Sequence, residues 1–256
     1  MKKKVLLFSS SKAGDSGFLI PNLPHIESFL RQMRETLPTY NPPVKKPLEV
    51  LFIPYAGVSI DHDMYYQRVK TILATLKVEV KSLHHYQDVK TQVEKANVIM
   101  VGGGNTFQLL KKLYDLDLMD LIRQRVEAGT PYIGWSAGSN IAGPSIRTTN
   151  DMPIVEPPTF KALNLIPWQV NPHYIENNPP GHNGETRQQR IEEYLKLNPD
   201  NKVIALPEGT GLSLNKSKLY IVSNEVAYVY SRRAGYKVEK TEFDFRNDLN
   251  TILEKW

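Results

Sequence analysis

Residues 131–140 read PYIGWSAGSN, and this stretch predicts a strand that turns sharply into a helix. A short apolar run leads into the G-x-S-x-G pattern of a nucleophile elbow, formed by Gly134, Ser136 and Gly138. At such an elbow the serine hydroxyl is exposed, and residues two positions away must lack bulk. Ala137 would present its backbone N–H at the helix start, where it can hold an oxyanion. An ordinary turn with a buried serine fits the same five residues, so the motif alone leaves both interpretations open.

The segments before the elbow alternate between buried strands and amphipathic helices. Continuous apolar runs predict strands, and apolar residues at helical spacing predict the helices between them. This order favours an α/β fold with a doubly wound, mostly parallel sheet and right-handed crossovers. The strands are expected at 5–8, 48–53, 78–83 and 97–101, and the helices at 25–37, 65–76, 89–95, 106–114 and 118–128.

The pattern loosens after the elbow. A polar loop at 146–158 is followed by an expected strand at 165–171, and a proline-rich segment at 38–47 reads as a surface connection. Thr186 and Gln189 form a plausible capping box at the start of a further helix. The remaining elements are expected as a helix at 186–197, a strand at 202–206, and short antiparallel strands at 212–214, 218–222 and 226–230.

Composition limits the class of protein. The 256 residues, 41% of them hydrophobic, suit one globular domain or at most two small ones, and we expect a single domain spanning 1–256. The chain has no cysteine, which excludes disulfides, thiolate catalysis and cysteine metal sites. No signal peptide or membrane-length apolar run is evident, so we expect a cytoplasmic protein without a membrane partner. The net charge is +5, but the basic residues are interleaved with acidic ones, which favours a solvated surface over a nucleic-acid groove.

Three glycines follow the strand expected at 97–101. The segment Gly102–Asn105 would turn with its N–H groups exposed, and such a nest binds anions or oxyanions. The glycine patterns of dinucleotide and P-loop sites do not fit, because Phe107 occupies the third glycine place and no lysine follows in register. Ligands of such sheets collect at the carboxyl ends of the strands. We therefore expect the nest and Ser136 to lie close together.

A serine nucleophile needs a base, and histidine is the usual one. His173 is the first choice among six histidines, because it follows an expected strand and a proline that fixes its approach. A hydrogen-bonded structural role is the plainer interpretation of any single histidine. The other candidates are His25, His62, His84, His85 and His182.

The base in turn needs an acceptor to orient it. Asp151 and Glu208 both fall in expected loops that could face the site, although either could be a surface charge or a helix cap. The order Ser136, Asp151, His173 matches that of α/β-hydrolases, but the interval is too short for the strands and helices of that fold.

Arg187 would lie in the first turn of its helix, where a cation opposes the helix dipole by about 0.3–1 kcal/mol. A ligand carboxylate would relieve this repulsion. A salt bridge to Glu185 would also do so, and the sequence leaves both open.

Taken together, the motifs resemble those of the peptidase E family of aspartyl dipeptidases. The similarity runs from the first strand to about Gly209, and its motifs are long and colinear. The segments that carry it are Val101–Leu110, Tyr132–Asn140, Ile146–Val155, Asn171–His173 and Gly181–Arg187.

The resemblance implies a class I glutamine-amidotransferase-like, flavodoxin-like α/β fold. It also implies hydrolysis of dipeptides that begin with aspartate. Ser136 matches the nucleophile, His173 the base and Asp151 the acid, with Glu208 as the alternative acid.

The resemblance further implies how substrate is held. Gly104 and Ala137 match the backbone donors of the oxyanion hole, and Arg187 matches the residue that binds the substrate's aspartate side chain. It implies no metal and no cofactor. The expected partner is a small peptide with an N-terminal aspartate, and a homodimer is left open.

Other functions share these features. A cyanophycinase-like exopeptidase acting on a β-aspartyl-arginine polymer would use the same fold. A non-catalytic anion-binding module or an esterase would also account for the nest and the elbow.

Overall fold

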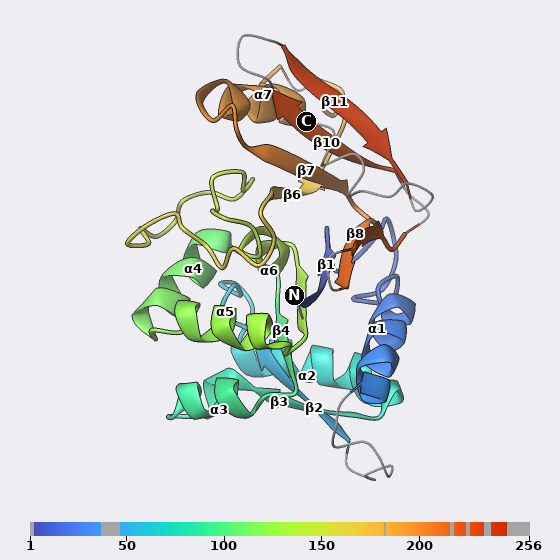
Figure 1. Cartoon of the computed structure of the whole chain (residues 1–256), viewed down its shortest axis with the longest axis vertical. Coiled ribbons are helices and arrows are strands. Elements are labelled where there is room, and N and C mark those ends of the chain that lie inside the picture. The colour runs from blue at the N-terminus through green and yellow to red at the C-terminus, as the bar shows by residue number, and fades with distance from the viewer. Residues whose placement is uncertain are drawn as a thin grey trace.

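The structure is a computed structural model that describes residues 3–36, 47–181, 183–215, 218–223, 226–232 and 237–244. Its larger sheet has seven strands in the order β3-β2-β4-β5-β1-β8-β9 (Figure 1). The first five are parallel, and β8 and β9 continue the sheet antiparallel. The strands are β1 (Lys4–Phe8), β2 (Leu48–Ile53), β3 (Val78–Ser82), β4 (Val98–Val101), β5 (Tyr132–Trp135), β8 (Gly211–Asn215) and β9 (Lys218–Ile221).

Helices cover both faces of this sheet because its strands are apolar on both sides. Val5 and Leu7 of β1 pack in the core on one face, whereas Leu6 and Phe8 pack in the core on the other. The sequence prediction of a doubly wound, parallel-rich sheet is confirmed. One face carries α1 (Leu23–Thr36) and α2 (His62–Leu73), and the other α3 (Val89–Lys95), α4 (Thr106–Asp115) and α5 (Met119–Ala128).

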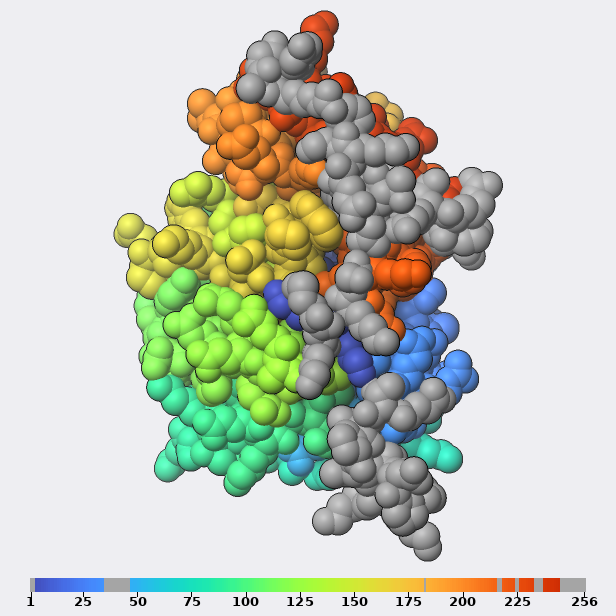
Figure 2. Space-filling model, in the orientation of Figure 1, coloured from blue at the N-terminus to red at the C-terminus, as the bar shows by residue number. Residues whose placement is uncertain are grey.

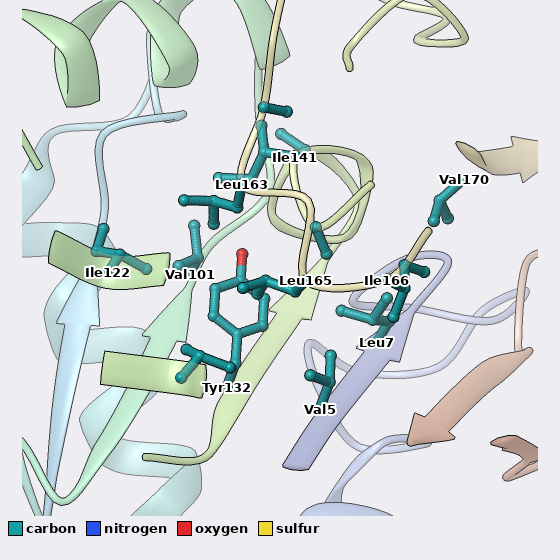
Figure 3. Packing of buried hydrophobic residues seen from close by; sticks show 14 of the residues in the cluster. Val5, Leu7, Val101, Ile122, Tyr132, Ile141, Leu163, Leu165, Ile166 and Val170 are labelled. Carbon is teal, nitrogen blue, oxygen red and sulfur yellow. The ribbon is translucent and has the colours of Figure 1, made fainter. Parts of the chain in front are cut away.

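Strand β5 lies between β4 and β1, near the middle of the sheet. Figure 3 shows Tyr132 of β5 beneath Leu163 and Leu165, which come from the loop after the elbow. The hydroxyl of Tyr132 donates a hydrogen bond of 2.6 Å to the carbonyl of Gly138. The elbow therefore stands on a packed core.

A second sheet, which the sequence did not predict, forms the other end of the molecule (Figure 1). It has the order β11-β10-β7-β6, and α7 packs on it through Ile191 and Leu195. The strand expected at 226–230 joins this sheet as β10, because its partner is β7 and not β9. Its elements are β6 (Gln169–Tyr174), α7 (Arg187–Leu197), β7 (Lys202–Pro207), β10 (Ala227–Arg232) and β11 (Val238–Phe243).

The boundaries of two elements differ from expectation. Helix α2 begins at His62, because Asp61 caps it by accepting bonds from Asp63 and Met64. A short 3₁₀ helix, η2 (Ala74–Leu76), follows α2, and a second one, η3 (Leu83–His85), follows β3. The strand expected at 165–171 lies at 169–174, so His173 is inside β6 and not beyond it.

A loop at 141–168 connects the elbow to β6. Figure 2 shows this part of the chain, coloured yellow-green to yellow, between the helices of the larger sheet and α7. Side chains fasten the loop to β6: Thr148 donates to the carbonyl of Val170, and Asn171 donates to the carbonyl of Thr148. The loop therefore holds Asp151 at the border between the two sheets.

Two features singled out in the sequence, His182 and most of the proline-rich segment at 38–47, lie outside the described residues. Within the part of the chain that is described, no helix is both long and apolar enough to cross a membrane.

Candidate active site

The elbow has the strained backbone that its sequence predicts. Ser136 links β5 to the short helix α6 (Ala137–Asn140) with φ 53° and ψ −114°. Its N–H donates to the carbonyl of Phe8. A side chain at Gly138 is excluded because its Cβ would lie 2.3 Å from the carbonyl oxygen of Val101. The helix thus starts directly against the sheet and leaves the serine hydroxyl at its rim.

His173 reaches Ser136 from the second sheet. Its Nε2 lies 2.9 Å from Oγ of Ser136. The pairing of β6 with β7 is irregular between Asn171 and Tyr174, and His173 has a positive φ of 54°. This departure from regular strand geometry accompanies the turn of the imidazole toward the elbow.

Glu208 stands on the far side of the imidazole. Its Oε1 lies 2.9 Å from Nδ1 of His173. Glu208 follows β7 in a tight turn, in which the N–H and hydroxyl of Thr210 both donate to the carbonyl of Pro207. Ser136, His173 and Glu208 therefore form one hydrogen-bonded chain built from three separate elements.

Asp151, the acid favoured from the sequence, is hydrogen-bonded to α4 instead of His173. Its Oδ2 accepts a bond of 2.7 Å from the N–H of Thr106, the first residue of α4. A carboxylate is stabilised at a helix N-terminus by the free N–H groups and the dipole. The loop that carries Asp151 is thereby docked on α4, and the acid hydrogen-bonded to His173 is Glu208.

Ser9 is a site residue that none of the sequence motifs indicated. It is fully buried, its Oγ accepts from the N–H of His173 at 2.9 Å, and its hydroxyl donates to the carbonyl of Leu206 at 2.8 Å. Ser9 thus joins the strand of the base to the strand before Glu208. Its place immediately after the first buried strand was the signal that could have revealed it.

The glycine nest lies against the serine, as expected from the topology. A Cβ added at Gly103 would lie 2.8 Å from Cβ of Ser136. Gly104 has φ 139°, and a side chain there would collide with the carbonyl of Ala56 at 2.1 Å. The Tyr65 hydroxyl holds the nest by donating to the carbonyl of Gly103 at 3.0 Å.

Arg187 is the first residue of α7, and the predicted capping box of Thr186 and Gln189 is present beside it. Glu185 does not neutralise it, since Glu185 lies 3.9 Å from Arg190 instead. Burial lowers the pKa of Arg187, the charge of Arg190 lowers it further, and the charge of Asp151 acts in the opposite direction. Among the described residues, no carboxylate forms an ion pair with this half-buried guanidinium.

Ser136, His173 and Asp151 line one small pocket. It joins the elbow, the start of α4, the 141–168 loop and the turn into His173. The lining residues are Thr106, Ser136, Ala137, Asn140, Thr149, Asn150, Asp151, Pro172 and His173.

The other histidines of the described chain have different partners. His25 packs near the ring of Phe8 on the α1 side of the sheet. His84 and His85 follow β3 at the edge of the sheet, where both contact Asp63, and the ring of His62 packs edge-on against that of His84. His173 is therefore the histidine that the described fold brings to the elbow.

A serine on a strained elbow, hydrogen-bonded to a histidine that a carboxylate orients, defines the class of serine hydrolases. Comparison with known proteins narrows this class. The model of peptidase family S51 matches residues 5–222, and the chain belongs to this family of serine peptidases.

Two relatives and one solved structure illustrate the similarity. The chain is 48% identical over 230 residues to a peptidase E of Shewanella denitrificans, covering 90% of this chain and 92% of that protein. It is 43% identical over 253 residues to a peptidase E of Shewanella amazonensis, covering 99% and 100%. A crystal structure of a peptidase from an acI-B1 Actinobacterium superposes with a TM-score of 0.65 at 18% identity, covering 96% and 98%, and supports the fold.

Proposed function

We propose that this serine peptidase hydrolyses dipeptides with an N-terminal aspartate through an acyl-enzyme. The observation that carries the proposal is the hydrogen-bonded chain Ser136–His173–Glu208, with both links at 2.9 Å. It is joined by a half-buried arginine at the start of α7, which interacts electrostatically with Asp151 of the pocket. The chain of bonds supports the reaction, and the arginine supports the choice of substrate.

In the proposed reaction His173 accepts the proton of Ser136 as Oγ attacks the scissile carbonyl. The imidazolium that forms is held by Glu208, whose contact with Nδ1 keeps Nε2 facing the serine. His173 then donates the proton to the leaving amine. Water, activated by the same imidazole, hydrolyses the acyl-enzyme and restores Ser136.

The oxyanion is assigned to two backbone donors. Ala137 begins α6, and the N–H of a first helical residue has no partner within its helix. Gly104 belongs to the nest that lies against Ser136. Donors fixed before the reaction stabilise the developing charge without reorganising.

The charges around the pocket complement a substrate with an N-terminal aspartate. Such a dipeptide carries a carboxylate and an ammonium group on the same residue. The guanidinium of Arg187 would take the carboxylate through two parallel bonds, which a lysine cannot form. Asp151, which lines the pocket and lies within electrostatic range of Arg187, would take the ammonium group. Its bond to Thr106 uses only one of its two oxygens.

The experiment compares three substrates on purified protein: Asp-Leu, a β-aspartyl dipeptide and a simple ester. We expect turnover of Asp-Leu far above that of the other two. Preference for the β-aspartyl compound would indicate a cyanophycinase-like exopeptidase, and preference for the ester would indicate an esterase. Either result would contradict the proposal.

The matched control is Ser136→Ala, assayed beside the wild type. Loss of the nucleophile removes about 10⁶ in kcat from a serine peptidase. Residual Asp-Leu hydrolysis near the wild-type rate, in a preparation free of other peptidases, would exclude Ser136 as the nucleophile.

A further inference from the structure

Three side chains of types that bind metal ions lie close together outside the pocket, at the edge of the larger sheet. Asp63 comes from the first turn of α2, and His84 and His85 come from η3, directly after the edge strand β3. Oδ1 of Asp63 lies 3.1 Å from Nε2 of His84 and 2.5 Å from Nε2 of His85. The three ligand atoms all lie within 4.8 Å of one another.

We propose that Asp63, His84 and His85 form a site for a divalent transition-metal ion of the Zn²⁺ type. Two imidazoles and one carboxylate are ligands that such ions prefer, and hard ions such as Mg²⁺ take mostly oxygen. Tetrahedral zinc with bonds of about 2.0–2.2 Å sets its ligand atoms about 3.3 Å apart. The observed separations need only small side-chain adjustments to reach this spacing, and a fourth position remains for water.

A buried hydroxyl positions one of the histidines. Oγ of Ser82 lies 2.7 Å from Nδ1 of His84, and Ser82 is fully buried at the end of β3. This contact holds the ring with Nε2 facing Asp63. Because a hydroxyl both donates and accepts, it can also stabilise the tautomer that leaves Nε2 free to bind a metal. A second contact of this kind is typical of histidine ligands.

The cluster is separate from the peptidase pocket. In the sheet order, β3 lies three strands from β5, which carries the elbow. Neighbouring strands are about 4.8 Å apart, so the strands that carry the two sites are separated by roughly 14 Å across the sheet. An ion there would tie the start of α2 to the end of β3. Tyr65, two residues after Asp63, holds the glycine nest, so the ion would brace a helix that supports the active site.

The test is calorimetric titration with Zn²⁺ of the full chain, freed of any affinity tag and stripped with a chelator. We expect one equivalent bound per chain and a rise in Tm on adding Zn²⁺, because a ligand that binds only the folded state stabilises it. His84→Ala, His85→Ala and Asp63→Asn should each weaken binding at least about tenfold, and Ser82→Ala should weaken it about 10–100-fold. The matched control, His25→Ala, removes a histidine of α1 that packs near Phe8 of β1, four strands from β3, and should bind as the wild type does.

The outcome is decided by variants that keep the fold. His85 and Asp63 have exposed side chains, so their replacements leave no cavity, and circular dichroism of the metal-free proteins checks this. Absence of Zn²⁺ binding to the wild type would overturn the proposal. Equal binding by the wild type and the folded His85→Ala and Asp63→Asn variants would overturn it as well.

Discussion

Nδ1 of His173 lies 2.9 Å from Oε1 of Glu208, although 35 positions separate the two residues in the chain. His173 lies at the irregular point of β6, and Glu208 directly follows β7. Strands β6 and β7 run parallel, side by side. Their contact is therefore a product of strand pairing. This pairing brings Glu208 to His173, whereas the sequence motifs favoured Asp151 as the acid.

Removing the charge of each acid in turn should distinguish the role of Glu208 from that of Asp151. Loss of an orienting carboxylate costs up to about 10⁴ in kcat, so Glu208→Gln should lower kcat for Asp-Leu steeply. Asp151→Asn keeps an oxygen for the bond to Thr106 and should raise KM more than it lowers kcat. Steady-state kinetics at equal folded fraction measure both. A collapse of kcat confined to Asp151→Asn would make Asp151 the orienting acid.

Arg187 should determine the preference for a substrate with an aspartate side chain. Breaking a buried ion pair by removing one partner costs about 3–5 kcal/mol, so Arg187→Ala should lower kcat/KM for Asp-Leu by at least roughly 10²–10³-fold. Asn-Leu should change little. Arg187→Lys should recover only part of the loss, because a point charge cannot reproduce the fork of the guanidinium.

A neighbouring cation provides the control for that series. Arg190 lies three residues further along α7, is exposed, and faces Glu185 at 3.9 Å. Arg190→Ala should leave kcat/KM for Asp-Leu within a few-fold of the wild type. Equal proportional losses on Asp-Leu and Asn-Leu in Arg187→Ala would mean that Arg187 supports the fold and does not select aspartate.

Ser9 should matter for both stability and rate. Ser9→Ala leaves the N–H of His173 and the carbonyl of Leu206 without their hydroxyl partner, and an unsatisfied buried group costs about 1–3 kcal/mol. We expect a fall in Tm of several degrees together with a lower kcat, as His173 loses its anchor. Ser10→Ala changes the adjacent serine, which contacts Lys12, and serves as the control in calorimetry and kinetics. A Ser9→Ala enzyme with wild-type kcat would show that β6 holds His173 without this bond.

Gly104 should tolerate no side chain. A Cβ there would lie 2.1 Å from a backbone oxygen at φ 139°, so Gly104→Ala should displace the nest. Removing one oxyanion donor costs about 10²–10³ in kcat, and we expect a loss of this size with KM less affected. Gly14→Ala, at φ 51° with open space around it, tests backbone strain alone and should retain activity. Wild-type kcat in Gly104→Ala would exclude Gly104 as a donor.

Several features of this protein were determined by the sequence alone, because they depend on neighbours within a few residues. Buried strands and amphipathic helices alternate up to Ala128, and that periodicity decides the doubly wound sheet. The stereochemistry of Gly134–Gly138 decides the elbow, and Thr186 with Gln189 decides where α7 begins. Such local signals can be interpreted without knowing which other elements each segment contacts.

Other features were decided only by the tertiary structure. Glu208 contacts His173 because β6 pairs with β7, whereas Asp151 bonds the start of α4 because its loop docks there. The pinning of His173 by Ser9, and the meeting of Asp63 with His84 and His85, likewise join segments that are distant in the chain. Periodicity identifies a strand but not its neighbour, and a loop's direction depends on the surface that receives it. The physical reason is that these contacts form between elements, where strand pairing, docking and burial act together.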